Sequence, residues 1–347
     1  MEKFILQNII RKNILAMKPY SCARDEFKGS EGIFLDANEN PFGELNRYPD
    51  PYQSAVKQEL ARLKNIDVNR IFIGNGSDEV IDLAYRVFCN PGTDRAVSFP
   101  PTYGMYRVSA EINDVEMIEI PLCADFQINL AALSPFFDDV HLKVIFICSP
   151  NNPTGNLIKL NDISFILDNF KGIVFVDEAY IDFAGSQSLI SWIDRYPNLI
   201  VSQTFSKSRA LASARVGLAY SNPEIIAYWN RVKAPYNVSG PNQKAAYDAL
   251  VNEEDFLIRK SAILEEKQRL QKELPKVPLI RKVYPSDANF FLVEVEDANM
   301  VYSKLIEMKI VTRNRNSVIN NCIRITVGTE AENTALLKAL RQLTVNN

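Results

Sequence analysis

The residues of this chain best suited to chemistry are an amide, a carboxylate, a phenol and a lysine between residues 144 and 215. Asn152 lies in Asn-Asn-Pro-Thr-Gly, Asp177 and Tyr180 lie in Asp-Glu-Ala-Tyr, and Lys207 ends Thr-Phe-Ser-Lys. Each cluster follows an apolar run, which is typical of a buried strand. Ligands of open parallel sheets bind beyond the carboxyl ends of the strands. We therefore expect these side chains to converge on one edge of a sheet.

Lys207 and Asp177 together could hold an aldehyde cofactor that contains a pyridine ring. A lysine in a cleft beyond a buried strand loses solvation, which lowers its pKa and lets the neutral amine form a Schiff base. A carboxylate at the end of a buried strand needs a cationic partner, such as a protonated ring nitrogen. Taken alone, Asp177 is better interpreted as a helix cap or an ion-pair partner, and Lys207 as a surface lysine. Their combination favours the cofactor.

Two further places in the sequence could bind anions. Ser77 and Asp78 open an expected helix after Gly-Asn-Gly, and helix N-terminal amides can bind phosphate; an ordinary serine cap is an equally good interpretation. The Gly-Lys-Ser/Thr ending of a P-loop is absent. Arg324 lies in an expected strand, on one face with Cys322 and Thr326. It could bind an anionic substrate bidentately or face solvent.

Apolar runs alternate with amphipathic segments through the middle of the chain, which predicts an α/β fold with a mostly parallel sheet. The runs are continuous rather than alternating, which indicates strands buried on both faces. A helix is expected from Ser77 to about Phe88. The expected strands are 70–73, 96–99, 117–120, 144–148, 173–176, 199–202 and 216–220.

The pattern changes after residue 253. Phe256, Ile263 and Leu270 recur at heptad spacing among charged residues, which predicts one long amphipathic helix over 253–274. Shorter strands follow at 290–295 and 322–327, with a closing helix from residue 329. We interpret this part as a smaller α+β domain. The predicted division is a large domain of residues 40–255 and a small domain of residues 1–39 and 256–347.

Composition narrows the class of protein further. A chain of 347 residues suits one large and one smaller domain. With 39 basic and 42 acidic residues, a general nucleic-acid surface is not expected. Five scattered cysteines favour a reducing compartment and a cytoplasmic location. His141 is the only histidine, so a histidine-based metal site is a weak expectation. No uncharged apolar run reaches about 18 residues, so no membrane-spanning helix is expected.

At this point the chain resembles the fold type I pyridoxal-phosphate enzymes over nearly its whole length, with similar motifs in the same order. Within that superfamily it is most similar to the histidinol-phosphate aminotransferases. The segments that carry the resemblance are 19–24, 36–43, 47–49, 100–106 and 324–329. The Asn-Asn-Pro-Thr-Gly and Ser-Lys motifs are shared across the superfamily and are specific for the cofactor rather than for the substrate.

The resemblance implies pyridoxal 5'-phosphate as the cofactor and a role for each matching residue. Lys207 would hold the cofactor and move protons, and Asp177 would pair with the pyridine nitrogen. The remaining cofactor contacts would be Asn152 and Tyr180 at the ring hydroxyl, Tyr103 on the ring face, and Ser77, Asp78, Thr204, Ser206 and Arg215 around the phosphate. Tyr48 would reach that phosphate from the partner subunit of a homodimer. The substrate would be held by Tyr20, Asn40, Arg313 and Arg324.

The loop after Lys207 departs from the family pattern. Arg209 stands near the place where the family usually has an aromatic residue, and Ser213 near the place of a glycine. The spacing from Lys207 to Arg215 is kept, so the phosphate role of Arg215 is still expected. The conformation of this loop is the less predictable part of the site.

The resemblance implies transfer of an amino group between L-histidinol phosphate and 2-oxoglutarate, a reaction of histidine biosynthesis. A threonine-phosphate decarboxylase or an aromatic aminotransferase on the same fold would keep the same cofactor residues. Only substrate assays would separate these enzymes. A non-catalytic α/β binding protein is a fourth alternative, and the intact Lys207, Asp177 and Tyr180 argue against it.

Overall fold

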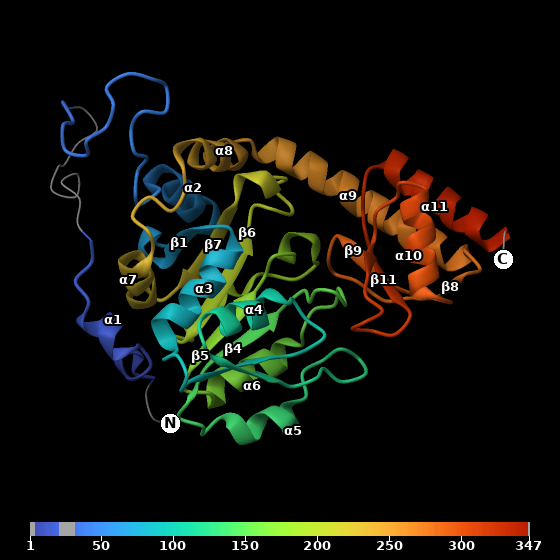
Figure 1. Cartoon of the computed structure of the whole chain (residues 1–347), viewed down its shortest axis with the longest axis horizontal. Helices are drawn as coiled ribbons and strands as arrows, with labels where there is room; N and C mark the ends of the chain where they lie inside the picture. The colour runs from blue at the N-terminus through green and yellow to red at the C-terminus, as the bar shows by residue number, and fades with distance from the viewer. Residues whose placement is uncertain (1–3, 21–31, 346–347) are drawn as a thin grey trace.

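The larger of two sheets in this computed structural model, which describes residues 4–20 and 32–345, has seven strands in the order β1-β7-β6-β5-β4-β2-β3. Figure 1 shows this sheet at the centre of the N-terminal two thirds of the molecule. Its strands are β1 (Ile71–Asn75), β2 (Arg95–Ser98), β3 (Glu116–Glu119), β4 (Leu142–Cys148), β5 (Ile173–Asp177), β6 (Leu199–Thr204) and β7 (Val216–Ser221). Each strand begins and ends within two residues of its predicted bounds.

All strands of this sheet except β7 run in the same direction. The neighbours β3, β2, β4, β5 and β6 pair in parallel, and β7 is antiparallel to both β6 and β1. The prediction of a mostly parallel sheet is therefore confirmed. Every residue of β5, β6 and β7 is buried, as expected for strands covered on both faces.

Helices cover both faces of the large sheet, and each strand contributes alternate side chains to two cores. In β4, Ile145 and Ile147 belong to one core, whereas Val144 and Phe146 belong to the other. The first core is closed by α2 (Ser54–Lys64), α5 (Leu130–Leu133), α6 (Leu160–Asn169) and α8 (Gly240–Val251). The second is closed by α1 (Lys12–Ala16), α3 (Ser77–Phe88), α4 (Met105–Ile112) and α7 (Pro223–Val232).

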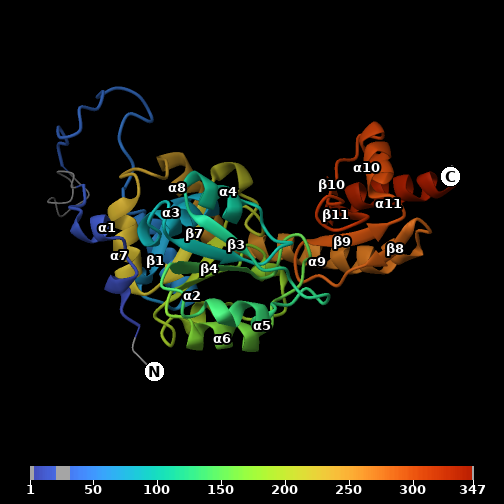
Figure 2. The same ribbon diagram turned by 60° about the horizontal axis from the view of Figure 1, so that its bottom comes forward.

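The C-terminal part has its own core, next to the large sheet. Helix α9 (Glu253–Glu273) leads to an antiparallel sheet with the order β10-β11-β9-β8 (Figures 1 and 2). Phe256 and Leu270 are buried along α9, as the heptad spacing predicts. The other elements of this part are β8 (Ile280–Val283), β9 (Phe290–Val295), α10 (Ala298–Glu307), β10 (Arg313–Asn314), β11 (Cys322–Thr326) and α11 (Glu330–Val345).

The first described residues pack on the large sheet. Leu6, Ile9, Ile10 and Ile14 are buried in the core that contains α3 and α7. The predicted division groups residues 1–39 with the C-terminal part, and this packing does not support that grouping for residues 6–14. Elsewhere the division remains a prediction. Across residues 4–20 and 32–345, no helix has both the length and the apolar character needed to cross a membrane.

Candidate active site

A cavity of about 130 Å³ lies at the carboxyl ends of β4, β5 and β6. The structure therefore brings together the side chains that we expected to converge on one edge of the sheet. The predicted cofactor residues that line this cavity are Ser77, Asp78, Tyr103, Asn152, Asp177, Tyr180, Thr204, Ser206, Lys207 and Arg215. Cys148, Ala179 and Ala212 complete the lining.

Asp177 is the last residue of β5 and is buried at the inner end of the cavity. Its Oδ2 accepts a hydrogen bond of 2.8 Å from the hydroxyl of Tyr106, and its Oδ1 accepts one of 3.1 Å from the amide of Ala179. Burial raises the pKa of Asp177 to about 6, although both hydrogen bonds oppose this shift. A cationic group in the cavity would restore the ionised carboxylate.

Tyr106 is a site residue that the sequence analysis did not identify. It lies in α4, fully buried, and its ring stacks on Phe146 with 5.1 Å between the ring centroids. Its position three residues after Tyr103 places both rings on one side of the helix start, and the two rings meet edge to face. That spacing was the available signal, but nothing in the sequence links Tyr106 to Asp177.

Lys207 enters the cavity from the loop that follows β6. Its Nζ lies 5.7 Å from the centre of the Tyr180 ring. Burial lowers the pKa of Lys207, and the positive charge of Arg324 lowers it further; the negative charge of Asp177 partly opposes them. A lowered pKa increases the fraction of neutral amine, which is the nucleophilic form.

Arg324 reaches the edge of the same cavity from β11 in the C-terminal sheet. Its Nη1 donates a hydrogen bond to Oδ1 of Asn152, whose Nδ2 lies 3.4 Å from the hydroxyl of Tyr180. Arg324 also lies over the ring of Phe290, at 5.2 Å from the centroid. Its Nε is buried and has no hydrogen-bond partner within residues 4–20 and 32–345. The Arg324 guanidinium therefore lies against Asn152 of the cavity wall, and its binding of an anionic substrate remains a prediction.

Arg215 and Asp78 form the wall of the cavity next to the start of α3. Arg215 Nη2 lies 3.1 Å from Oδ2 of Asp78, and the hydroxyl of Tyr103 donates to Oδ1 of Asp78 at 3.0 Å. Arg215 Nη1 lies 3.5 Å from Oγ of Ser206. The amide of Ser206 donates to Oγ1 of Thr204 at 3.1 Å, which fixes the turn before Lys207. This wall thus combines a guanidinium, the Ser206 hydroxyl and the start of a helix, which are groups typical of an anion site, with the carboxylate of Asp78.

Gly76 leaves room for the Arg215 guanidinium in this wall of the cavity. It has a φ of +80°, and a Cβ at this position would lie 2.4 Å from Nη2 of Arg215. Gly217, on the neighbouring β7, leaves similar room: a Cβ there would lie 2.2 Å from the amide nitrogen of Ser77. The two glycines let the guanidinium and the first amide of α3 approach the same space.

Five predicted site residues do not line the cavity in this single chain: Arg324 contacts it through Asn152, and the other four have their own surroundings. Tyr48 stacks on Tyr236 at 4.5 Å, and Tyr20 is exposed beside α7. Asn40 Oδ1 accepts a hydrogen bond from the amide of Phe42. Arg313 is exposed on β10, where it pairs in register with Arg324. Residues 21–24 of the segment 19–24, which also carried the family resemblance, lie outside the described residues.

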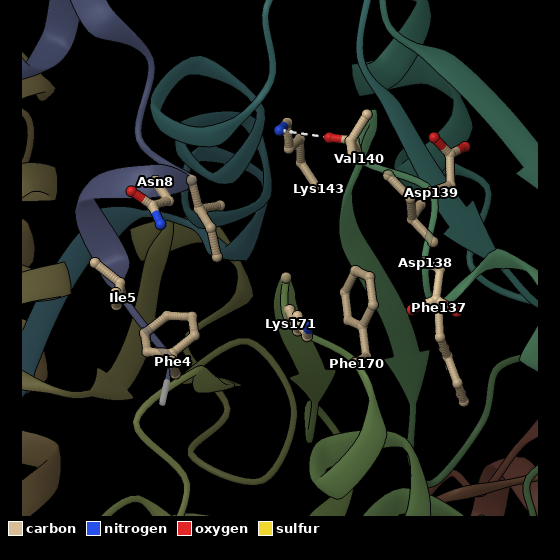
Figure 3. Close-up of a pocket in the computed structure, with 13 residues that line it drawn as sticks. Phe4, Ile5, Asn8, Phe137, Asp138, Asp139, Val140, Lys143, Phe170 and Lys171 are labelled. Atoms are coloured by element: carbon tan, nitrogen blue, oxygen red, sulfur yellow. Dashed lines mark hydrogen bonds between the residues drawn. The ribbon is translucent and has the colours of Figure 1, made fainter. Parts of the chain in front are cut away.

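A larger cavity of about 460 Å³ lies at the opposite edge of the sheet, before the starts of β4 and β5 (Figure 3). Two of its charged side chains have partners outside the cavity lining or on the backbone. Lys143 Nζ donates to the carbonyl of Val140 at 2.7 Å, and Asp139 pairs with Arg95 at 2.9 Å. Apolar side chains such as Phe4, Phe137 and Phe170 also line this cavity (Figure 3). We therefore take the smaller cavity as the active site.

A metal centre finds no support in the part of the chain that the structure describes. Within residues 4–20 and 32–345, no three His, Cys, Asp or Glu side chains form a group that could hold a metal ion. His141 lies in the turn before β4, and its Nδ1 is 3.5 Å from Asp94.

The fold and this cavity define a class of enzyme, and sequence comparison agrees with it. Residues 25–340 match the family described as aminotransferase class I and II, so the chain belongs to that family. It is 50% identical to the histidinol-phosphate aminotransferase of Cytophaga hutchinsonii, over 97% of this chain and 99% of that protein. It is 47% identical to the one of Christiangramia forsetii, over 99% of each.

Solved structures show the same relationship. The histidinol-phosphate aminotransferase from Clostridium acetobutylicum is similar with a TM-score of 0.80 and 26% identity, over 87% of this chain and 92% of that one. The L-threonine-O-3-phosphate decarboxylase from Porphyromonas gingivalis shares the fold with a TM-score of 0.72 at 20% identity, over 87% and 92%. The predicted fold class and family resemblance are both confirmed.

Proposed function

We propose that this chain transfers the amino group between L-histidinol phosphate and 2-oxoglutarate, with pyridoxal 5'-phosphate as cofactor. The products are imidazole-acetol phosphate and L-glutamate, and the reaction belongs to histidine biosynthesis. The observation that carries the proposal is the cavity that holds Lys207 and a buried Asp177, in a chain half identical over its length to an enzyme of that name.

The groups that line the cavity suit the cofactor in charge. Arg215, for whose guanidinium Gly76 leaves room, and the amides at the start of α3 would hold its phosphate. Asp177 would pair with the ring nitrogen, and this cation would offset the burial that raises the pKa of the carboxyl. Asn152 and Tyr180 would bind the ring hydroxyl. When bound, pyridoxal phosphate supplies an electron sink for the negative charge that forms at the substrate carbon.

Lys207 is the acid and base of the proposed reaction. Its Nζ lies inside the cavity, and the lowered pKa of Lys207 favours the neutral amine, the form that would take the α-proton of the substrate. The same nitrogen returns a proton later in the cycle. The Tyr106 hydroxyl and the Ala179 amide keep both oxygens of Asp177 in a fixed orientation throughout.

The arginines of the C-terminal sheet would select the substrate. Arg313 and Arg324 are paired in register across β10 and β11. The Nε–H of Arg324 has no acceptor among the residues that the structure describes. A planar guanidinium can bind either phosphate or carboxylate with two parallel hydrogen bonds, so it suits both the histidinol phosphate and the oxo acid. Tyr20 and Asn40 would complete this part of the site.

The active form that we propose is a cytoplasmic homodimer. Leu35 and Phe42, at 88% and 83% exposed, leave an apolar surface on the segment 32–48, which extends from the body of the molecule (Figure 1). Exposed apolar surface of this kind is typical of an interface. Tyr48 lies on the same segment, outside the cavity of its own chain. A second copy would cover the segment and supply Tyr48 to the neighbouring cavity.

Half-reactions distinguish this function from its rivals. The cofactor-loaded protein is mixed separately with histidinol phosphate, threonine phosphate and phenylalanine, and the visible absorption of the bound cofactor is followed. We expect histidinol phosphate to convert it fastest, without release of carbon dioxide. Faster conversion by threonine phosphate with carbon dioxide release, or by phenylalanine, would overturn the proposal in favour of the corresponding rival.

A further inference from the structure

Arg209, two residues after Lys207, makes three different contacts with one guanidinium group. Nη1 donates to the carbonyl of Ala249 at 3.0 Å and lies 3.0 Å from Oε2 of Glu253, while Nη2 lies 3.5 Å from Oε1 of Glu253. The guanidinium carbon lies 3.6 Å from the centre of the Phe256 ring. The Arg209 side chain is only 13% exposed, so its charge is largely shielded from solvent by these contacts.

These contacts fix Arg209 to the junction of two helices. Ala249 belongs to the last turn of α8, whose carbonyls have no partner within the helix, and Glu253 is the first residue of α9. A cation is favourable at a helix C-terminus, and the Glu253 carboxylate is favourable at a helix N-terminus. Arg209 therefore holds the end of α8 and the start of α9 with a single side chain.

The loop that carries Lys207 is held on both sides of the lysine. The amide of Ala210 donates to the carbonyl of Lys207 at 3.2 Å, and the amide of Leu211 donates to the carbonyl of Phe205 at 3.0 Å. Ser208 donates a hydrogen bond from its hydroxyl to Asp182, just beyond Tyr180. Ser208 thus ties the loop to the turn that follows β5, and Arg209 ties it to α9.

Helix α9 connects this junction to the C-terminal sheet. It begins at Glu253 and Phe256 beside Arg209, and ends with Leu270 buried in the core under β9 and β11. Arg324 on β11 in turn reaches the cavity that contains Lys207. Figure 1 shows α9 as the long connection between the two sheets.

We propose that Arg209 is a positioning residue that fixes the Lys207 loop to the start of α9 and so sets the place of the lysine relative to the C-terminal sheet. The inference rests on the proposed function. It concerns a position where this chain departs from the aromatic residue of the family. The flat guanidinium occupies a stacking position on Phe256 and adds an ionic link to Glu253.

The test compares Arg209→Ala and Arg209→Lys with Arg259→Ala in the full-length protein. Arg259 lies on α9 and pairs at 3.0 Å with Asp255 of the same helix, so this ion pair includes no residue of the Lys207 loop. Arg209→Lys keeps the charge and loses the fork and the flat stacking surface. Two quantities are measured: the dissociation constant of pyridoxal phosphate, and the pH dependence with which the Lys207 amine is acylated in the cofactor-free protein.

We expect Arg209→Ala to weaken cofactor binding roughly tenfold, because charged hydrogen bonds and a buried cation–π contact are lost together. The acylation midpoint of Lys207 should rise, since a released loop lets water reach the amine. The charged groups that act on Lys207 are Arg324, Asp177, Arg215 and Asp78, and Arg209 is not among them. If the acylation midpoint of Lys207 also rises in Arg209→Lys, but by less than in Arg209→Ala, the change therefore reflects the position of Lys207 rather than the charge of residue 209.

The outcomes separate the inference from the proposed function. If wild-type protein binds no pyridoxal phosphate, the proposed function fails. If it does bind, and the Arg209 variants match the Arg259 variant in both quantities, Arg209 has no positioning role. A lower melting temperature alone, with both quantities unchanged, would also overturn the inference. Should Arg209→Ala not fold, Arg209→Lys and Phe256→Leu carry the same test.

Discussion

At the scale of single residues, the site contains two ionisable groups whose pKa values are shifted from their ordinary values. Burial raises the pKa of Asp177 to about 6, and burial with the charge of Arg324 lowers the pKa of Lys207. Both shifts favour the neutral forms of these groups. A cationic partner would favour the ionised carboxylate of Asp177, and the lowered pKa of Lys207 favours its nucleophilic form.

Asp177→Asn should stabilise the cofactor-free protein while it impairs the enzyme. The folded state keeps a proton on Asp177 that the unfolded chain releases above about pH 4, so stability falls as pH rises from about 4 to 6, by up to about 3 kcal/mol. Asparagine removes this penalty. Urea unfolding should show the variant more stable than wild type at pH 8 and equal to it at pH 4.

The same variant should lose turnover by roughly 100-fold or more, because the ring nitrogen loses its ionic partner. Tyr106→Phe provides the comparison, since it removes one hydrogen bond to Asp177 and keeps the carboxylate. Its turnover should be closer to that of wild type. Wild-type turnover in Asp177→Asn would contradict the assigned role.

Arg324→Gln should raise the pKa of Lys207. The charge of Arg324 is the second largest cause of the lowered value, after burial. The pH dependence of acylation of Lys207 in the cofactor-free protein reports this change. Arg313→Gln is the matched control, because Arg313 lies opposite Arg324 in the strand register but does not act on Lys207. Equal midpoints in the two variants would show that Arg324 does not act on the amine.

At the scale of elements, the turns after the strands determine the shape of the cavity. The wall around Arg215 needs β1 and β7 side by side, because Gly76 follows one strand and Arg215 precedes the other. Arg215 itself has a φ of +51°, a left-handed conformation that turns the chain directly into β7. Small changes in these turns should therefore act on cofactor binding more than on the sheet.

Gly76→Ala should weaken binding of pyridoxal phosphate by roughly 100-fold. The added Cβ would meet the Arg215 guanidinium, and alanine disfavours a φ of +80°, at a cost of about 1–3 kcal/mol. Equilibrium titration with the cofactor measures the effect. Gly185→Ala is the control, because nothing lies within 4 Å of a Cβ built there. If the two variants bind alike, Gly76 is not required for the phosphate wall.

The sequence predicted these elements well where one local signal was sufficient. Buried strands such as β5 read as continuous apolar runs, and Ser77 to Phe88 forms the helix expected from its pattern. The antiparallel direction of β7 was not predicted, since a fully buried strand looks the same in either direction. Tyr106 and Arg209 were not assigned to the site, because their partners lie far away in the sequence.

At the scale of the whole molecule, one chain holds only part of the proposed site. Ten of the predicted cofactor residues line the cavity, whereas Tyr48 lies on the exposed segment 32–48. Arg313 and Arg324, which we propose as substrate-binding residues, come from the other sheet, at the far end of α9. The proposed site is therefore complete only when two domains and two chains are in place.

Subunit mixing tests this arrangement. Lys207→Ala and Tyr48→Ala homodimers should each have low activity. In a mixed dimer, one site would combine Lys207 of one chain with Tyr48 of its partner, both unmutated, and activity should return to roughly half that of wild type. No recovery, with dimers verified by sedimentation velocity, would place Tyr48 outside the neighbouring site.

Leu35→Asp should shift the equilibrium between dimer and monomer toward monomers, because it places a charge on the apolar segment.

The pairing of β1 with β7 also has a consequence for folding of the chain during its synthesis on the ribosome. These two strands lie at the beginning and the end of the large sheet in sequence, yet their contact creates the wall formed by Gly76 and Arg215. A nascent chain that has left the ribosome only as far as β6 can pair its parallel strands but lacks that wall. Long-range pairing of this kind forms late in folding. Cofactor capture should therefore report completion of the large sheet during synthesis.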